Sequence, residues 1–262
     1  METKVQFLSI DELQLEYYLY PASPDRKDSP TLVFLHEGLG CSALWRGVPE
    51  KIRDQLGKPS VLVFSRAGYG KSTPLQGDRP VTYMHQEALE MLPRVLKALE
   101  IERPILVGHS DGGSIALIHA GAGFPVAALV LIAPHVIVED QSINGIAAAR
   151  DIFLSTNLQE KMSKYHLDAE STFWGWNRVW LSPEFKQWNI EEYLPSIDAP
   201  ILAIQGDMDE YGTLAQLDLI DRGVAGEVKR KIVPGAKHSP HLQFTEEVVE
   251  AVVEFVNPLL NS

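Results

Sequence analysis

A serine, a cluster of acids and a histidine follow three apolar runs of the chain, in an order that suits one kind of chemistry. Ser110 stands in VGHSDGG (107–113), with a glycine two residues away on either side. Acids gather in GDMDEYG (206–212), and histidines follow in GAKHSPH (235–241). A serine hydroxyl becomes a nucleophile when a base takes its proton and a carboxylate orients that base. The order serine, acid, histidine therefore predicts nucleophilic catalysis.

The glycines around Ser110 predict a sharp turn between a strand and a helix. The apolar run 104–108 precedes the turn, and residues 114–124 follow it with helical spacing. Such a turn crowds backbone against backbone, so only small residues fit beside the serine, whose hydroxyl is left exposed in a strained conformation. The N-terminus of the following helix offers free N–H groups where an oxyanion would form. This context predicts a nucleophile elbow.

The other apolar runs predict a mostly parallel, doubly wound α/β sheet that would position these residues. Two short alternating runs, 5–10 and 13–20, are typical of an antiparallel hairpin. Continuous Val, Ile and Leu runs are typical of strands buried on both faces, and they occupy 31–35, 60–64, 104–108, 127–133, 200–206 and 228–233. Helical spacing separates them over 42–56, 83–100, 114–124, 213–220 and 245–260. This alternation predicts the doubly wound architecture.

Residues 135–195 interrupt the alternation, because they contain helical patterns and no convincing strand. We expect a helical cap here, inserted in an α/β core of residues 1–134 and 196–262, since the segment is too small for a generous core of its own. Four of the five tryptophans lie in it. They could pack the cap on the core, line an apolar substrate pocket, or do both. The candidate substrate-binding residues are Phe173, Trp174, Trp176 and His135, and Arg178 or His135 could anchor a substrate carboxylate.

Several of these motifs resemble those of the α/β-hydrolase superfamily, and the resemblance covers nearly the whole chain. The motifs are FLHEGLG (34–40), SRAGYGKS (65–72), GHSDGG, GDMD and GAKHSPH. The resemblance implies a serine hydrolase that needs no cofactor and acts on a small molecule through an acyl-enzyme. The aromatic cap suggests a small to medium, partly apolar ester or lactone.

The resemblance also implies an acid and a base for Ser110. In this family the acid usually stands three residues after a strand-terminal glycine, which selects Asp209, with Asp207 as the second choice. The base is usually the histidine of a G-x-x-H-like turn, which selects His238 over His241. The expected catalytic residues are therefore Ser110, Asp209 and His238.

The oxyanion hole shows both a match and two departures from the family. The resemblance implies that one N–H comes from Asp111, after the nucleophile, and the other from Gly38, in the loop that follows His36. Family members commonly have glycine where this chain has Glu37, and an apolar or amide residue where it has Asp111. Two additional carboxylates would disfavour a developing negative charge unless they point away or are paired. They could instead orient a water or bind a polar group of the substrate.

Two glycine patterns suggest nucleotide binding instead. GYGKS (68–72) ends like a P-loop, but Ser65 stands where the first glycine is required. GLGCSA (38–43) satisfies G-x-G-x-x-A, and Arg66 after the next strand could meet a 2′-phosphate. This predicts a rival function, a dinucleotide-dependent oxidoreductase. The motif follows the third predicted strand instead of the first, however, and it leaves the order of serine, acid and histidine unexplained.

Two further alternatives share the hydrolase fold: a carbon–carbon bond hydrolase of the meta-cleavage-product type, and a small-molecule receptor with slow turnover or none. His36 and His109 are expected to orient or pack. His238 and His241 lack the additional ligands of a metal site, so we expect no metal.

The composition excludes several partners. A net charge of −12 disfavours nucleic acid and anionic membrane surfaces. No apolar run is long enough to span a membrane, and residues 1–18 do not resemble a signal peptide. The lone Cys41 fits a reducing compartment, so we expect a cytoplasmic protein. The oligomeric state is not predicted.

Overall fold

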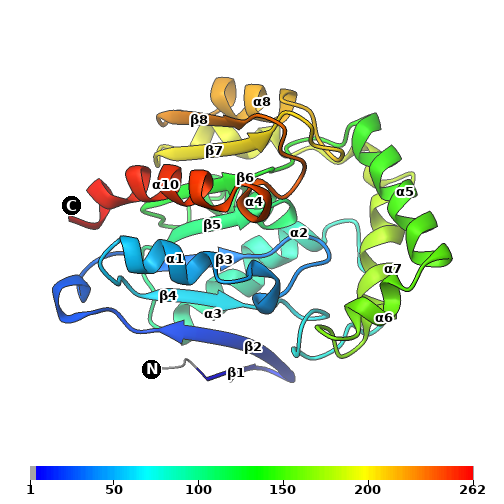
Figure 1. The fold of residues 1–262 in the computed structure, drawn as a ribbon, viewed down its shortest axis with the longest axis horizontal. Helices are drawn as coiled ribbons and strands as arrows, with labels where there is room; N and C mark the ends of the chain where they lie inside the picture. The colour runs from blue at the N-terminus through cyan, green and yellow to red at the C-terminus, as the bar shows by residue number, and fades with distance from the viewer. Residues whose placement is uncertain (1–3, 262) are drawn as a thin grey trace.

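The computed structural model describes residues 4–261 and contains one eight-stranded sheet with the order β1-β2-β4-β3-β5-β6-β7-β8 (Figure 1). β1 (Gln6–Ile10) and β2 (Leu13–Tyr20) form the expected antiparallel hairpin, and β2 also pairs antiparallel with β4. The remaining neighbours pair in parallel. These strands are β3 (Leu32–Leu35), β4 (Val61–Phe64), β5 (Ile105–His109), β6 (Ala128–Ile132), β7 (Ile201–Gly206) and β8 (Val228–Val233). The predicted mostly parallel sheet is confirmed.

Alternate residues of each buried strand point to opposite sides of the sheet. Both faces are therefore apolar, and helices cover both. Val33 and Leu35 belong to one hydrophobic core, and Leu32 and Phe34 to the other. The face of Phe34 packs against α1 (Val48–Gln55) and α10 (Thr245–Val256), both in front of the sheet in Figure 1. The opposite face packs against α3 (Leu92–Ala98), α4 (Asp111–Gly121) and α8 (Ala215–Gly223). The shorter helical turns outside the β6–β7 connection are η1 (Pro24–Arg26), η2 (Ser42–Trp45), α2 (Tyr83–Gln86), η3 (Glu87–Met91), α9 (Pro240–Gln243) and η6 (Asn257–Asn261).

Two predicted helices are divided into shorter elements. The helix expected over 42–56 is split into η2 and α1, because Arg46 and Gly47 take positive φ values of 49° and 82°. The helix expected over 83–100 consists of α2, the π-helical turn η3 and α3. Pro93 lies in the first turn of α3, where its missing N–H breaks no hydrogen bond of that helix.

A helical segment, residues 140–196, connects β6 to β7. It contains α5 (Asp140–Ser155), α6 (Leu158–Met162), α7 (Ala169–Trp180), η4 (Phe185–Gln187) and η5 (Glu191–Ser196). α5, α6 and α7 lie together beyond one end of the sheet, at the right of Figure 1. Their apolar side chains share one hydrophobic core with the strands, which explains how so small a segment is held.

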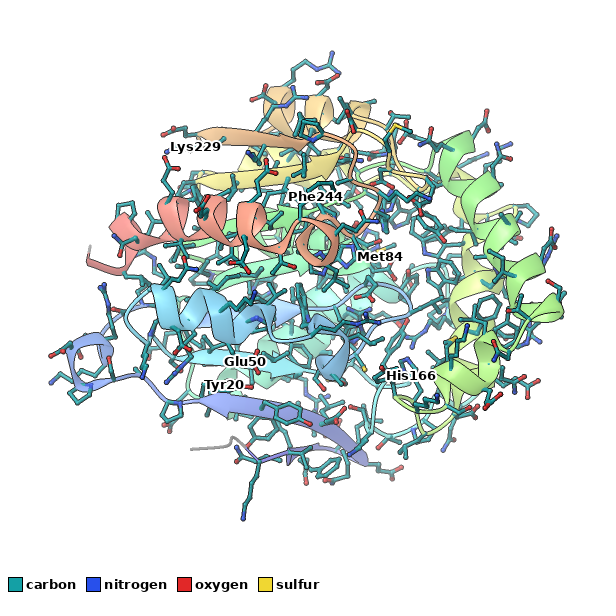
Figure 2. All side chains as sticks on the ribbon, in the orientation of Figure 1. Tyr20, Glu50, Met84, His166, Lys229 and Phe244 are labelled. Carbon is teal, nitrogen blue, oxygen red and sulfur yellow. The ribbon has the colours of Figure 1, made fainter. Side chains whose placement is uncertain are left out.

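His166 joins this segment to the loop after β4. It lies on the inner side of the segment, toward the sheet (Figure 2). Its Nδ1 accepts the N–H of Gly70 at 3.0 Å, and the N–H of Leu167 donates to the Gly70 carbonyl at 2.9 Å. The segment is therefore fastened to the core between α6 and α7.

Candidate active site

Ser110 occupies a strained turn between β5 and α4. Its φ and ψ are 53° and −118°, a region that residues other than glycine rarely adopt. A Cβ atom on Gly108 would lie 2.3 Å from the carbonyl oxygen of Gly112, and one on Gly112 would lie 2.0 Å from that of Leu35. Both glycines are required for this close approach, and the turn has the geometry expected of a nucleophile elbow.

Ser110, His238 and Asp209 form a continuous chain of contacts, although β5, β7 and β8 carry them from distant parts of the sequence. The Ser110 Oγ lies 2.9 Å from Nε2 of His238. The His238 Nδ1 lies 2.9 Å and 3.0 Å from the two carboxylate oxygens of Asp209. An ionised carboxylate only accepts, so the proton belongs on Nδ1 and the lone pair of Nε2 faces the serine hydroxyl. In this tautomer the imidazole can accept the hydroxyl proton.

Asp209 and His238 shift each other's pKa values. Burial alone would raise the pKa of Asp209, but the His238 ring and the N–H of Tyr211, which donates at 2.8 Å, lower that pKa below its usual value. Burial alone would lower the pKa of His238, but Asp209 outweighs it and raises that pKa above its usual value of 6.5. The site therefore favours the imidazolium that forms when Ser110 gives up its proton.

The two acids beside Asp209 contact backbone instead of the imidazole. An Oδ1 of Asp207 accepts the N–H of Gly235 at 2.6 Å, which braces the turn after β8. Glu210 accepts the backbone N–H of His238 at 3.2 Å. Of the three neighbouring acids, the structure brings Asp209 to the ring of His238.

The two residues expected to supply oxyanion N–H groups, Gly38 and Asp111, lie beside Ser110. Gly38 follows β3 and Asp111 begins α4, and both line the cavity at Ser110. Neither N–H donates to an acceptor within residues 4–261. For Asp111 this follows from its place in the first turn of a helix, where no preceding carbonyl is available. Both donors are therefore free to bind an oxygen atom of a substrate.

Arg66 holds the loop that carries Gly38. Its guanidinium donates to the carbonyls of His36 at 2.5 Å and Glu37 at 3.1 Å, and its backbone N–H donates to Nε2 of His36 at 3.1 Å. Arg66 is only 1% exposed, so it is not available for the 2′-phosphate of a dinucleotide. Arg66 therefore does not support the dinucleotide-binding interpretation of GLGCSA.

Asp111 is buried beside the oxyanion position and is paired on one side. Its Oδ2 accepts the hydroxyl of Tyr83 at 2.5 Å, and that hydroxyl accepts the indole N–H of Trp180 at 3.0 Å. Burial raises the pKa of Asp111 above its usual range. One oxygen of this carboxyl group is therefore paired, which an acid beside an oxyanion position requires.

A cavity of about 150 Å³ opens at Ser110. Among the predicted substrate-binding residues, it brings together Trp176 and His135. Burial lowers the pKa of His135 to about 3, so this ring is neutral and offers hydrogen bonding without charge. The cavity is also lined by Ser110, His238, Gly38 and Asp111, and by Glu37, Leu39, His109, Ile146, Trp180, Tyr211 and Ser239.

The structure does not bring Phe173 and Trp174 to this cavity, which corrects the expectation for both. Phe173 is fully buried, and its ring stacks on that of Phe153 with 3.8 Å between the centroids. Trp174 lines a separate groove together with Arg178, whose guanidinium pairs with Asp78 at 2.8 Å. Arg178 therefore cannot anchor a substrate carboxylate beside Ser110.

Two cavity residues that the sequence reasoning missed come from the same helical segment. Trp180 follows Trp176 by four residues on α7, a spacing that places both on one face of the helix. Ile146 projects from α5. The spacing of the two tryptophans was the signal that could have identified Trp180.

Other chemistry finds little support in the described part of the chain. Within residues 4–261, no three His, Cys, Asp or Glu side chains gather in a way that could hold a metal ion. Burial raises the pKa of Cys41 to about 12, so its thiol is a poor nucleophile. No helix described between residues 4 and 261 combines the length and the apolar character needed to cross a membrane.

A comparison with curated proteins finds similar serine hydrolases. Serine hydrolase BPHL from Homo sapiens is 26% identical over 211 residues, which are 75% of this chain and 69% of that protein. The same protein from Mus musculus is 27% identical over 211 residues, with the same coverage.

Solved structures share the fold. A proline iminopeptidase from Mycobacterium smegmatis has a TM-score of 0.78 at 20% identity, over 98% of this chain and 99% of that one. A structure from a study of carboxylesterases of Nitrososphaera gargenis has a TM-score of 0.79 at 15% identity, with the same coverage. A family model described as "Alpha/beta hydrolase family" matches residues 32–251. Since this match spans most of the sequence, the chain belongs to the alpha/beta hydrolase family.

Proposed function

We propose that the protein is a serine hydrolase that cleaves a small, partly apolar carboxylic ester or lactone through an acyl-enzyme. The observation that carries the proposal is the chain of contacts from the Ser110 hydroxyl through His238 to Asp209. Family membership and the similarity to Serine hydrolase BPHL support the same reaction class.

In the acylation step, His238 Nε2 takes the proton of Ser110 as the serine oxygen attacks the substrate carbonyl carbon. Asp209 holds the ring in the productive tautomer and stabilises the imidazolium. The N–H groups of Gly38 and Asp111 donate to the tetrahedral oxyanion, and each such donor typically contributes about 3–4 kcal/mol. His238 then gives its proton to the departing alkoxide, which leaves as an alcohol.

In the deacylation step, a water molecule takes the place of the alcohol. His238 accepts a proton from the water while the water oxygen attacks the acyl carbon. The same two N–H groups bind the second oxyanion. Collapse of this intermediate releases the carboxylic acid, and His238 returns the proton to Ser110.

The cavity supports a small acyl group. The cavity has a volume of about 150 Å³, which is enough for a molecule of the size of benzene. Trp176, Trp180 and Ile146 give it apolar walls, and no lysine or arginine is among its lining residues. A neutral acyl chain therefore suits it better than a carboxylate.

The test is the turnover of p-nitrophenyl esters from C2 to C12 by the wild-type protein and by Ser110→Ala. We expect the shortest esters to be hydrolysed fastest and the activity to vanish in the variant. Activity that survives in Ser110→Ala would overturn the proposed nucleophile. Inactivity of the wild-type protein on the whole panel would overturn the ester assignment and favour carbon–carbon hydrolysis or a receptor.

A further inference from the structure

A second carboxylate–imidazole pair lies beside the catalytic base, and the proposed mechanism does not use it. The Nε2 of His109 lies 2.8 Å from the backbone carbonyl oxygen of His238. The Nδ1 of the same ring lies 3.4 Å from Oε2 of Glu37. His109 is nearly fully buried, whereas Glu37 remains partly exposed in the cavity wall.

The contact with His238 determines where one proton of the His109 ring belongs. A carbonyl oxygen only accepts, so Nε2 must carry a proton. The carboxylate of Glu37 faces the other nitrogen, with 3.4 Å between Nδ1 and Oε2. Burial alone would raise the pKa of Glu37, but His109 outweighs it and lowers that pKa below its usual value. This favours an ionised Glu37 beside the ring of His109.

We propose that Glu37 and His109 form a positioning pair that fixes the backbone of His238 and couples the oxyanion loop to the catalytic base; this inference rests on the proposed function. Glu37 directly precedes the oxyanion donor Gly38, and His109 directly precedes Ser110. The pair therefore joins the loops after β3, β5 and β8, which hold the oxyanion donor, the nucleophile and the base. A shift of any one of these loops would disturb the other two.

The surroundings hold both members of the pair in place. A Cβ atom on Gly40 would lie 2.2 Å from Oε2 of Glu37, so the glycine leaves the space that the carboxylate occupies. Arg66 donates to the backbone carbonyl of Glu37 at 3.1 Å. The ring of His241 packs edge-on against that of His109, with 4.5 Å between the centroids. The two side chains are therefore confined to the orientation in which they meet.

The pair also changes the charge around the base. The carboxylate of Glu37 is one of the groups that raise the pKa of His238, after Asp209 and Glu210. Removing its charge should lower that pKa and move the acid limb of kcat/KM to lower pH. The titratable and charged groups around the pair and the base are Cys41, Arg66, Asp111, His135, His166, Asp209, Glu210, Tyr211 and His241.

The experiment compares Glu37→Gln, His109→Asn and the double variant on the best p-nitrophenyl ester across pH. We expect kcat to fall by about 10–100-fold in each, because a displaced base costs rate more than binding, while KM changes less. The acid limb should move to lower pH in Glu37→Gln. The double variant should be no worse than the worse single one, since the two residues act as a unit. Glu160→Gln, which removes a charge from an exposed position, is the control.

The outcomes separate this inference from the proposed function. Unchanged kcat and an unchanged pH profile in both variants, with Ser110→Ala inactive, would overturn the positioning pair alone. A lower kcat without a shift of the acid limb in Glu37→Gln would overturn the electrostatic coupling to His238. Activity in Ser110→Ala would overturn the proposed function itself.

A measurement on the wild-type protein covers the case in which a variant fails to fold. The ¹⁵N spectrum of its histidine side chains should show a proton on Nε2 of His109, because that nitrogen faces the backbone carbonyl of His238. A His109 ring whose Nε2 carries no proton would overturn the contact with His238 and with it the pair.

Discussion

Two carboxylate–imidazole pairs lie side by side at the carboxyl edge of the sheet, and their ring centroids are 5.2 Å apart. In the first pair, His238 meets Asp209 and turns its other nitrogen to the hydroxyl of Ser110. In the second, His109 meets Glu37 and turns its other nitrogen to a backbone carbonyl. A hydroxyl can give up a proton, whereas a carbonyl can only accept a hydrogen bond. The group that faces the nitrogen remote from the carboxylate therefore distinguishes the proposed base, His238, from the proposed positioning residue, His109.

The two pairs also differ in their exposure to solvent. The side chain of Asp209 is 1% exposed and that of Glu37 is 29% exposed. Charges interact more strongly where water is excluded, so Asp209 should influence its imidazole more than Glu37 does. The difference predicts a large loss of rate when the first pair is broken and a moderate one when the second is broken.

Removal of the nucleophile or the base should have the largest effect. We expect Ser110→Ala and His238→Ala each to lower kcat by about 10⁵–10⁶-fold, with the double variant scarcely worse, because the members of a triad act as a unit. Steady-state kinetics on a p-nitrophenyl ester measures this, and circular dichroism checks the fold. Mild, additive losses would contradict the triad.

Replacement of the acid should rank second. Asp209→Asn keeps the shape of the side chain but removes the charge that holds the productive tautomer of His238, so we expect kcat to fall by about 10⁴-fold. Asp207→Asn is the matched control, because the side chain of Asp207 accepts only the backbone N–H of Gly235 among the described hydrogen bonds. A larger loss in the control than in Asp209→Asn would reverse the assignment of the acid.

Substitution of a residue in the wall of the cavity should have a weaker effect on the rate than loss of the acid. Trp176→Ala enlarges the cavity, and we expect kcat/KM for the shortest ester to fall by about 10-fold while longer esters gain in relative rate. Trp174→Ala alters a groove elsewhere and should leave the chain-length profile unchanged. A profile that responds to Trp174 and not to Trp176 would place substrate binding in the other groove.

The pH profile should show the smallest effect. Catalysis needs neutral His238, and its pKa is raised, so kcat/KM should increase with pH through a midpoint above 6.5. Glu210→Gln can still accept the N–H of His238 but loses the charge that helps to raise this pKa. We expect its acid limb to move to lower pH by less than that of Asp209→Asn. A wild-type midpoint well below 6.5 would contradict the electrostatic description.

The sequence could indicate much of this site because local constraints control it. The glycines beside Ser110 predict a tight turn whatever the rest of the fold, and strand-like runs place Asp209 and His238 at the same edge of a parallel sheet. The choice of Asp209 over Asp207 depended on a family resemblance, because both acids follow the same strand. Only the fold shows which carboxylate reaches the imidazole.

The parts that the sequence could not predict depend on tertiary packing. Phe173 and Trp174 are aromatic residues of the kind that line apolar pockets. The orientation of α7 instead places Phe173 in the core and Trp174 in a separate groove. Glu37 was visible as a departure from the family, and His109 was expected to orient or pack. Their contact joins residues 72 positions apart, which no local pattern records.

The most direct test of the central claim is labelling by a fluorophosphonate, because it requires no knowledge of the substrate. The probe is added to the wild-type protein and to His238→Ala, and the modified residue is identified by mass spectrometry. We expect Ser110 to be labelled in the wild-type protein and His238→Ala to remove nearly all labelling. Labelling at another residue, or equal labelling of Ser110 in both proteins, would contradict the claim that His238 activates this serine.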